Sequence, residues 1–153
     1  MTLWVDADAC PGPIKELIIR AAKRLKIFTV FAANKYISVP DSGYVSTCRI
    51  GMEPEAVDSY ITEHAKAGDF VVTQDIPLAS ALVPVGVIVI SPRGELFTED
   101  NIGERLSIRN FMHDIREAGC ITPGPRGFSQ KDRQRFSDTL DRELTKSMKS
   151  ASS

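Results

Sequence analysis

The fold is decided by residues 2–33, which read TLWVDADACPGPIKELIIRAAKRLKIFTVFAA. Residues 2–6 form a short apolar run that ends in a carboxylate, and this predicts a buried strand. Apolar side chains then recur at spacings of three and four over 13–25, which predicts a helix, and a second apolar strand follows over 27–33. A strand, a helix and a strand at this spacing are typical of a βαβ unit, in which the two strands pair in parallel.

The rest of the chain continues this alternation of strands and helices. We expect a third strand over 44–50, a helix over 54–66, a strand over 70–73, a helix over 76–82, a strand over 85–90, a helix from the cap residue Thr98 to about Glu117, a loop over 122–128 and a final helix over 129–146 capped by Ser129, with a frayed tail from 148. The pattern predicts a single α/β domain over residues 1–153, with three layers and a mostly parallel central sheet.

The composition is that of an ordinary water-soluble protein, with 42% hydrophobic and 25% charged residues. No apolar run is long enough to cross a bilayer, so we expect no membrane association. Three cysteines, Cys10, Cys48 and Cys120, are odd in number and widely spaced, which argues against a disulfide framework and favours a reducing, cytoplasmic location. Cys10 has no partner cysteine nearby, so a packed structural thiol is the better interpretation.

Carboxylates follow two of the predicted buried strands. Asp6 and Asp8 come directly after the first strand, and Asp75 comes after a later one, so all three are expected at the same edge of a parallel sheet. Asp58 borders the apolar stripe of a helix, and Thr73 adds a hydroxyl near Asp75. Carboxylates without cysteine or histidine select hard cations such as Mg²⁺ or Mn²⁺, although Asp8 and Asp75 are also placed to cap the helices that follow them.

Positive charge gathers near the C-terminus. Residues 1–125 carry 12 Lys/Arg and 16 Asp/Glu, a net of −4, whereas residues 126–153 carry 7 and 4, a net of +3. Lys131 and Arg133 in this basic helix are candidates for contacts with a phosphate backbone, and a solvated amphipathic helix is the simpler alternative. Arg93 is a third phosphate candidate, and its guanidinium is equally suited to pair with a neighbouring glutamate.

Four blocks of sequence carry a family resemblance. Residues 4–11 (WVDADACP), 72–79 (VTQDIPLA), 91–98 (SPRGELFT) and 128–133 (FSQKDR) resemble the signature blocks of the YaiI/YqxD family of uncharacterised bacterial proteins. That family is in turn similar to PIN-like nuclease domains. The resemblance implies a PIN-like sheet, with Asp6, Asp58 and Asp75 as the catalytic and metal-binding acids and Asp8 as a possible fourth ligand.

Three functions remain open from the sequence. The first is a PIN-like ribonuclease that uses Mg²⁺ or Mn²⁺ to cleave single-stranded RNA. The second is a small-molecule phosphatase of the haloacid dehalogenase type, with Asp6 as nucleophile, Asp8 as acid/base and Thr73 as a phosphate ligand. The third is a binding module for RNA or metal that has the acidic pocket without turnover. The sequence does not predict the oligomeric state.

Overall fold

A computed structural model of the chain describes residues 1–40, 42–53, 55–121 and 127–152. The strands are β1 (Thr2–Asp6), β2 (Phe28–Ala33), β3 (Val45–Arg49), β4 (Phe70–Val72), β5 (Ile88–Ile90) and β6 (Leu96–Phe97). The α-helices are α1 (Gly12–Leu25), α2 (Ala56–His64), α3 (Ile76–Leu82), α4 (Glu99–Glu117) and α5 (Gln130–Ser152), and two short 3-10 turns occupy Ala7–Ala9 and Val83–Val85.

All six strands belong to one sheet, in the order β3-β2-β1-β4-β5-β6. The first five strands run in parallel, and β6 pairs with β5 in the antiparallel direction. The predicted α/β class with a mostly parallel sheet is therefore confirmed. Among the described helices, none combines the length and the apolar character that a membrane span requires.

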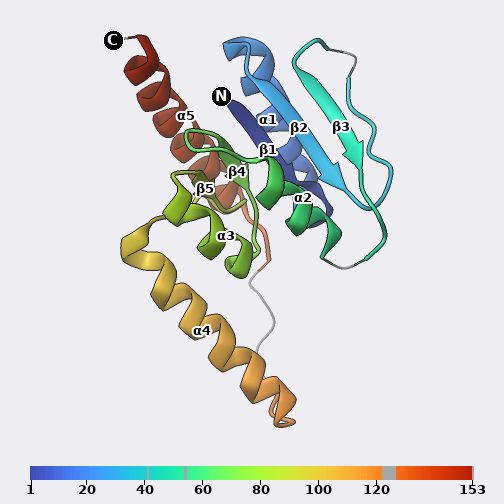
Figure 1. The fold of residues 1–153 in the computed structure, drawn as a ribbon, viewed down its shortest axis with the longest axis vertical. Coiled ribbons are helices and arrows are strands. Elements are labelled where there is room, and N and C mark those ends of the chain that lie inside the picture. The colour runs from blue at the N-terminus through green and yellow to red at the C-terminus, as the bar shows by residue number, and fades with distance from the viewer. Residues whose placement is uncertain (41, 54, 122–126, 153) are drawn as a thin grey trace.

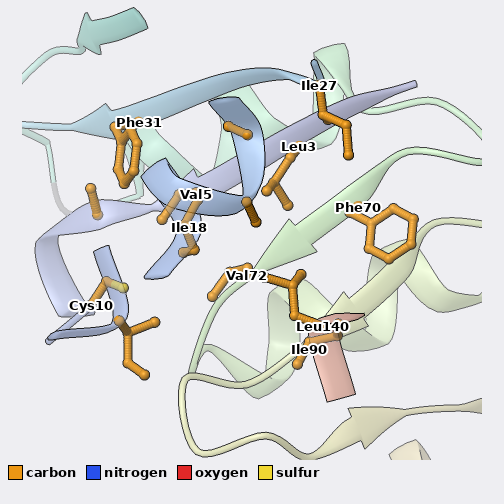
Figure 2. Packing of buried hydrophobic residues seen from close by; sticks show 14 of the residues in the cluster. Leu3, Val5, Cys10, Ile18, Ile27, Phe31, Phe70, Val72, Ile90 and Leu140 are labelled. Carbon is orange, nitrogen blue, oxygen red and sulfur yellow. The ribbon is translucent and has the colours of Figure 1, made fainter. Parts of the chain in front are cut away.

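The two faces of the sheet bury separate clusters of side chains, which makes three layers (Figure 1). Successive side chains of a strand point to opposite faces. In β1, Leu3 and Val5 therefore join a cluster with α1 and α5, which Figure 2 shows from close by. Trp4, between them, faces a second cluster made with α2, α3 and the start of α4. Beyond its first turns, α4 extends away from the sheet (Figure 1).

Asp69, a buried carboxylate, anchors Trp4 at the end of the sheet where the parallel strands begin. Its two oxygens accept hydrogen bonds from the Thr2 backbone N at 3.0 Å, the Trp4 Nε1 at 3.2 Å and the Lys66 backbone N at 2.9 Å. The other side of the indole meets the ring of Tyr60 on α2 edge to face, with centroids 5.9 Å apart. Asp69 is thus a structural residue that holds the first strand in place.

Several predicted boundaries are wrong in informative ways. The strand predicted over 85–90 begins only at Ile88, because Pro84 favours the 3-10 turn that ends at Val85. The two-residue β6 escaped prediction, since it is too short to show a period. Helix α5 continues to Ser152 instead of fraying from 148. The predicted loop over 122–128 lies largely outside the described residues.

Candidate functional site

The register of the sheet brings Asp6 and Thr73 together. Val5 of β1 pairs with Val72 of β4, so the residue that follows each of them reaches the same edge. The Thr73 hydroxyl is buried and donates a hydrogen bond to Asp6 Oδ2 at 2.9 Å. The Thr73 Oγ1 in turn accepts a hydrogen bond from the backbone N of Asp75 at 3.0 Å. Thr73 therefore ties together the two chain segments that carry these acids.

Asp75 has the predicted capping role at the start of α3. Its Oδ1 accepts a hydrogen bond from the backbone N of Leu78 at 3.0 Å, which satisfies one of the free N–H groups of the first turn. Pro77 within this turn has no N–H to satisfy. The capping bond fixes the carboxylate at the strand edge, beside the acids that arrive from β1 and α2.

Asp58 reaches this edge from α2. Val57 and Ile61 are buried against the sheet, and their packing orients the helix so that Asp58, half-buried, points along its margin toward Asp75. Burial raises the pKa of Asp58 to about 7, helped by a hydrogen bond with the carboxyl of Asp75. The negative charges of Asp75, Asp6 and Glu55 raise the pKa further. Asp58 therefore holds its proton to a higher pH than a free carboxyl group does.

The carboxyl of Asp6 lies close enough to Asp75 to feel its negative charge. Burial raises its pKa, the hydrogen bond from Thr73 lowers it, and the charges of Asp75 and Asp8 raise it again. The structure thus brings Asp6, Asp58 and Asp75 into one electrostatic unit from three separate elements. In the part of the chain that the structure describes, no three His, Cys, Asp or Glu side chains are already arranged to hold a metal ion.

Asp8 lies at the margin of this group and does not have the predicted capping role. Its Oδ2 accepts a hydrogen bond from the backbone N of Asn34, at the end of β2, at 2.9 Å. Helix α1 begins instead behind Pro11, which offers no side-chain cap. Asp8 is therefore held toward β2, yet it is close enough to Asp6 to raise the pKa of that acid.

Two cavities flank Asp75. One, of about 640 Å³, lies between α2 and α3 and is lined by Asp58, Asp75, Pro77 and Arg109 among others. The other, of about 390 Å³, is lined by Asp6, Gln74, Asp75, Pro77 and Arg109 among others. Because they share Asp75, Pro77 and Arg109, they form one acidic groove. Sequence reasoning missed Arg109, because it stands in the middle of an exposed helix without any motif around it.

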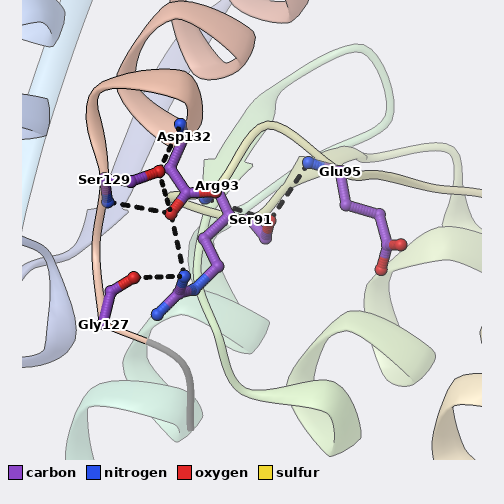
Figure 3. Close-up of polar contacts among 6 residues, drawn as sticks. All are labelled: Ser91, Arg93, Glu95, Gly127, Ser129 and Asp132. Carbon is purple, nitrogen blue, oxygen red and sulfur yellow. Dashed lines mark hydrogen bonds and ion pairs between the residues drawn. The ribbon is translucent and has the colours of Figure 1, made fainter.

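Arg93 is not at the acidic groove. Its Nη1 makes an ion pair with Asp132 Oδ2 at 2.9 Å and a hydrogen bond with the Gly127 carbonyl at 3.3 Å (Figure 3). The Asp132 carboxylate is buried and also accepts a hydrogen bond from the Ser129 backbone N at 3.0 Å. The predicted cap at Ser129 is thus present as a reciprocal pair, since its hydroxyl accepts from the Asp132 backbone N at 3.3 Å. Arg93 fastens the start of α5 to the turn after β5.

The other two predicted phosphate ligands lie on α5, on different sides of it. Lys131 lines a cavity of about 500 Å³ together with Arg135, Arg142 and the turn at Gly94. Arg133, two positions further along the helix, is absent from this lining. Of the described residues that line the acidic groove, none comes from α5.

Cys10 is a packed thiol, as expected. The side chain is buried in the cluster between β1 and α1. Burial raises the pKa of Cys10 to about 12, the cation of Lys15 lowers it slightly and the charge of Asp6 raises it. Because the thiolate is the reactive form, this cysteine is unsuited to act as a nucleophile.

Comparison with known proteins places the chain in a family. The family described as "Uncharacterized BCR, YaiI/YqxD family" matches residues 4–146. A UPF0178 protein of Syntrophobacter fumaroxidans is 70% identical, and the match covers 97% of each chain. A UPF0178 protein of Myxococcus xanthus is 54% identical, and the match covers 97% of each chain. A UPF0178 protein of Trichlorobacter lovleyi is 47% identical, and the match covers 99% of this chain and 98% of the relative. No solved structure matches the chain with significance. The chain therefore belongs to the YaiI/YqxD family of uncharacterised bacterial proteins.

Proposed function

We propose that the acidic groove is the active site of a divalent-metal-dependent nuclease that hydrolyses phosphodiester bonds in single-stranded RNA. The observation that carries this proposal is that Asp6, Asp58 and Asp75, which arrive from different elements of the fold, line one groove, with Asp6 and the Asp75 backbone joined through Thr73. Carboxylates crowded in this way repel one another unless a proton or a cation relieves the charge. The resemblance to PIN-like nuclease domains, which carry acids after two core strands and within a central helix, supports the same chemistry.

The donor set suits Mg²⁺ or Mn²⁺, because it consists of carboxylates without sulfur or imidazole. Asp6, Asp58 and Asp75 would hold the ion, with Asp8 as a fourth acid at the margin. A bound ion of this kind lowers the pKa of an attacking water and stabilises the leaving oxygen. A proton on Asp58, whose pKa is raised, relieves the repulsion in the absence of a cation. That proton must leave before the ion can bind, so affinity should rise with pH.

The remaining residues of the site hold the acids in place. The Thr73 hydroxyl orients Asp6 through the hydrogen bond that it donates, and it contacts the Asp75 backbone through the one that it accepts. The bond from Leu78 N fixes the Asp75 side chain in turn. Fixed ligands need no reorganisation when substrate arrives, which is the main contribution that a protein makes to a metal-dependent hydrolysis.

Asp6→Asn and Asp75→Asn test this proposal. Each variant should lose cleavage of a single-stranded oligoribonucleotide in Mn²⁺ or Mg²⁺ and should keep the wild-type circular dichroism spectrum. Asp114→Asn is the matched control, because it removes an exposed carboxylate near the end of α4 and should retain full cleavage. Isothermal titration with Mn²⁺ at pH 6 and pH 8 supplies a second readout, in which wild-type affinity should be higher at pH 8.

Three results would count against the proposal. Full cleavage by either site variant would exclude the acids from the reaction. RNA binding without cleavage, unchanged in Asp6→Asn, would indicate a binding module. A burst of the alcohol product from a small phosphomonoester, with the phosphoryl group retained on Asp6 and released as phosphate in a slower hydrolysis step, would indicate a phosphatase instead.

A further inference from the structure

Arg109, on α4, lies beside the acidic groove. The first half of this helix packs against α3, and Arg109 lines both parts of the acidic groove. Pro77 and Asp75 are the other two residues that both parts share. Arg109 therefore borders the groove where the space beside Asp58 meets the space beside Asp6.

The charge around Arg109 is almost entirely negative. Of the described side chains that line the groove, every other charged one is a carboxylate, namely Glu55, Asp58, Glu63, Asp75 and Asp6. Arg109 nevertheless forms no ion pair within the described residues, and its Nη1 donates a hydrogen bond to Asn110 Oδ1 at 3.2 Å. Its neighbour one turn earlier, Arg105, does pair with a carboxylate, that of Glu95. The donors of Arg109 are thus largely available to a ligand in the groove.

We infer that Arg109 binds the non-bridging oxygens of an RNA phosphate in the acidic groove; this inference rests on the proposed nuclease function. A planar guanidinium offers several N–H donors in a fork that matches two phosphate oxygens. An acidic groove repels a polyanion, and a cation on the opposite wall is needed to hold the phosphate against the carboxylates. Arg109 is a substrate-binding and positioning residue, and it takes the place that the sequence had suggested for Arg93.

The test is a binding measurement that does not require turnover. The probe is a fluorescein-labelled, 2′-O-methylated single-stranded oligonucleotide, which resists cleavage, titrated in Ca²⁺ and followed by fluorescence anisotropy. Arg109→Ala should weaken binding about tenfold, since a charge-assisted hydrogen bond is lost, and Arg109→Lys should weaken it less. The slope of log affinity against log salt should fall by about one.

Arg20→Ala is the matched control, because Arg20 is an exposed arginine on α1, which covers the opposite face of the sheet. This variant should bind the probe as the wild type does. Wild-type affinity and an unchanged salt slope in Arg109→Ala would overturn the inference, as would equal losses in Arg109→Ala and Arg20→Ala. Failure of the wild type to bind the probe at all would also overturn it.

The two proposals fail separately. If Arg109→Ala loses affinity but the wild type leaves an unmodified oligoribonucleotide intact in Mn²⁺, the phosphate site stands and the nuclease function does not. If the wild type cleaves RNA and Arg109→Ala keeps both its KM and its affinity, the nuclease function stands and Arg109 has no role in binding. If both stand, Arg109→Ala should raise KM more than it lowers kcat, because the contact is present before the chemical step.

Discussion

Replacement of Asp58 by asparagine should stabilise the metal-free protein, by an amount that grows between about pH 4 and about pH 7 and is complete above neutral pH. Burial and the hydrogen bond with Asp75 raise the pKa of Asp58 to about 7, so its charged form is unfavourable in the folded state. The folded protein therefore binds this proton more tightly than the unfolded chain does. It follows that stability is lost as the pH rises from about 4 to about 7. An asparagine amide keeps a donor for Asp75 and carries no charge at any pH.

The expected size of this effect follows from the shift in pKa. A rise from 3.8 to about 7 is equivalent to about 4 kcal/mol at roughly 1.4 kcal/mol per pH unit. Asp58 is partly open to water, and solvent screening reduces the usable part to about 2 kcal/mol. In a domain of this size the gain corresponds to an increase in Tm of about 4–8 °C at pH 8. At pH 4 the two proteins should unfold alike.

The measurement is urea unfolding of Asp58→Asn and wild type in EDTA at pH 4, 6 and 8, followed by far-ultraviolet circular dichroism. Glu63→Gln serves as the control, since it removes an exposed carboxylate from the end of the same helix. Its effect on the free energy of unfolding should be small at every pH. A gain that is equal at all three pH values, or no gain for Asp58→Asn at pH 8, would refute the account of the raised pKa.

Three further predictions follow from other parts of the structure. Gly94→Ala should cost at least about 2 kcal/mol of unfolding free energy, because Gly94 has a φ of +88° and an added Cβ would lie 2.6 Å from the backbone carbon of Arg135. Gly103→Ala, in an open position on α4, should instead stabilise by about 0.5–1 kcal/mol, and chemical unfolding of both variants checks the pair. Cys120 is exposed and should react with iodoacetamide at pH 8 in the folded protein, whereas Cys10 should react only after unfolding, as peptide mass spectrometry can show; early labelling of Cys10 would contradict its burial. Mn²⁺ should raise the Tm of the wild type more at pH 7.5 than at pH 5.5, since the proton on Asp58 competes with the ion; a pH-independent shift in differential scanning fluorimetry would argue against that competition.

The sequence was sufficient for the architecture because its strong periodic segments are also those that the core buries. The apolar runs at 2–6 and 27–33 became β1 and β2 with the expected parallel pairing. The errors in the predicted elements occur where the local sequence has only a weak preference for a helix or a strand. β6 has two residues and exists because the turn after β5 folds back, a tertiary effect that no period reveals. The length of α5 depends on Leu140 and Leu144, whose burial anchors a polar helix that would fray alone.

The sequence allowed the positions of the acids at the candidate site to be predicted, but not the positions of the arginines. Asp6 ends β1 and Asp75 comes soon after β4, and parallel pairing alone brings such positions to one edge. Arg93 stood beside equally plausible partners in the sequence, yet its actual partner is Asp132, 39 positions away. Arg109 gave no signal, because the packing of α4 across the groove is set by contacts with α3 rather than by the residues around it.

Trp4 gives the protein an intrinsic spectroscopic probe of its own acidic groove. It is the single tryptophan of the chain, it stands two residues before Asp6, and its ring touches α2, the helix that carries Asp58. Any displacement of α2 that accompanies occupancy of the groove should therefore change the emission of one known fluorophore. Because the indole N–H is fixed by Asp69 at the far end of the sheet, such a change would report movement of the helix against an immobile reference.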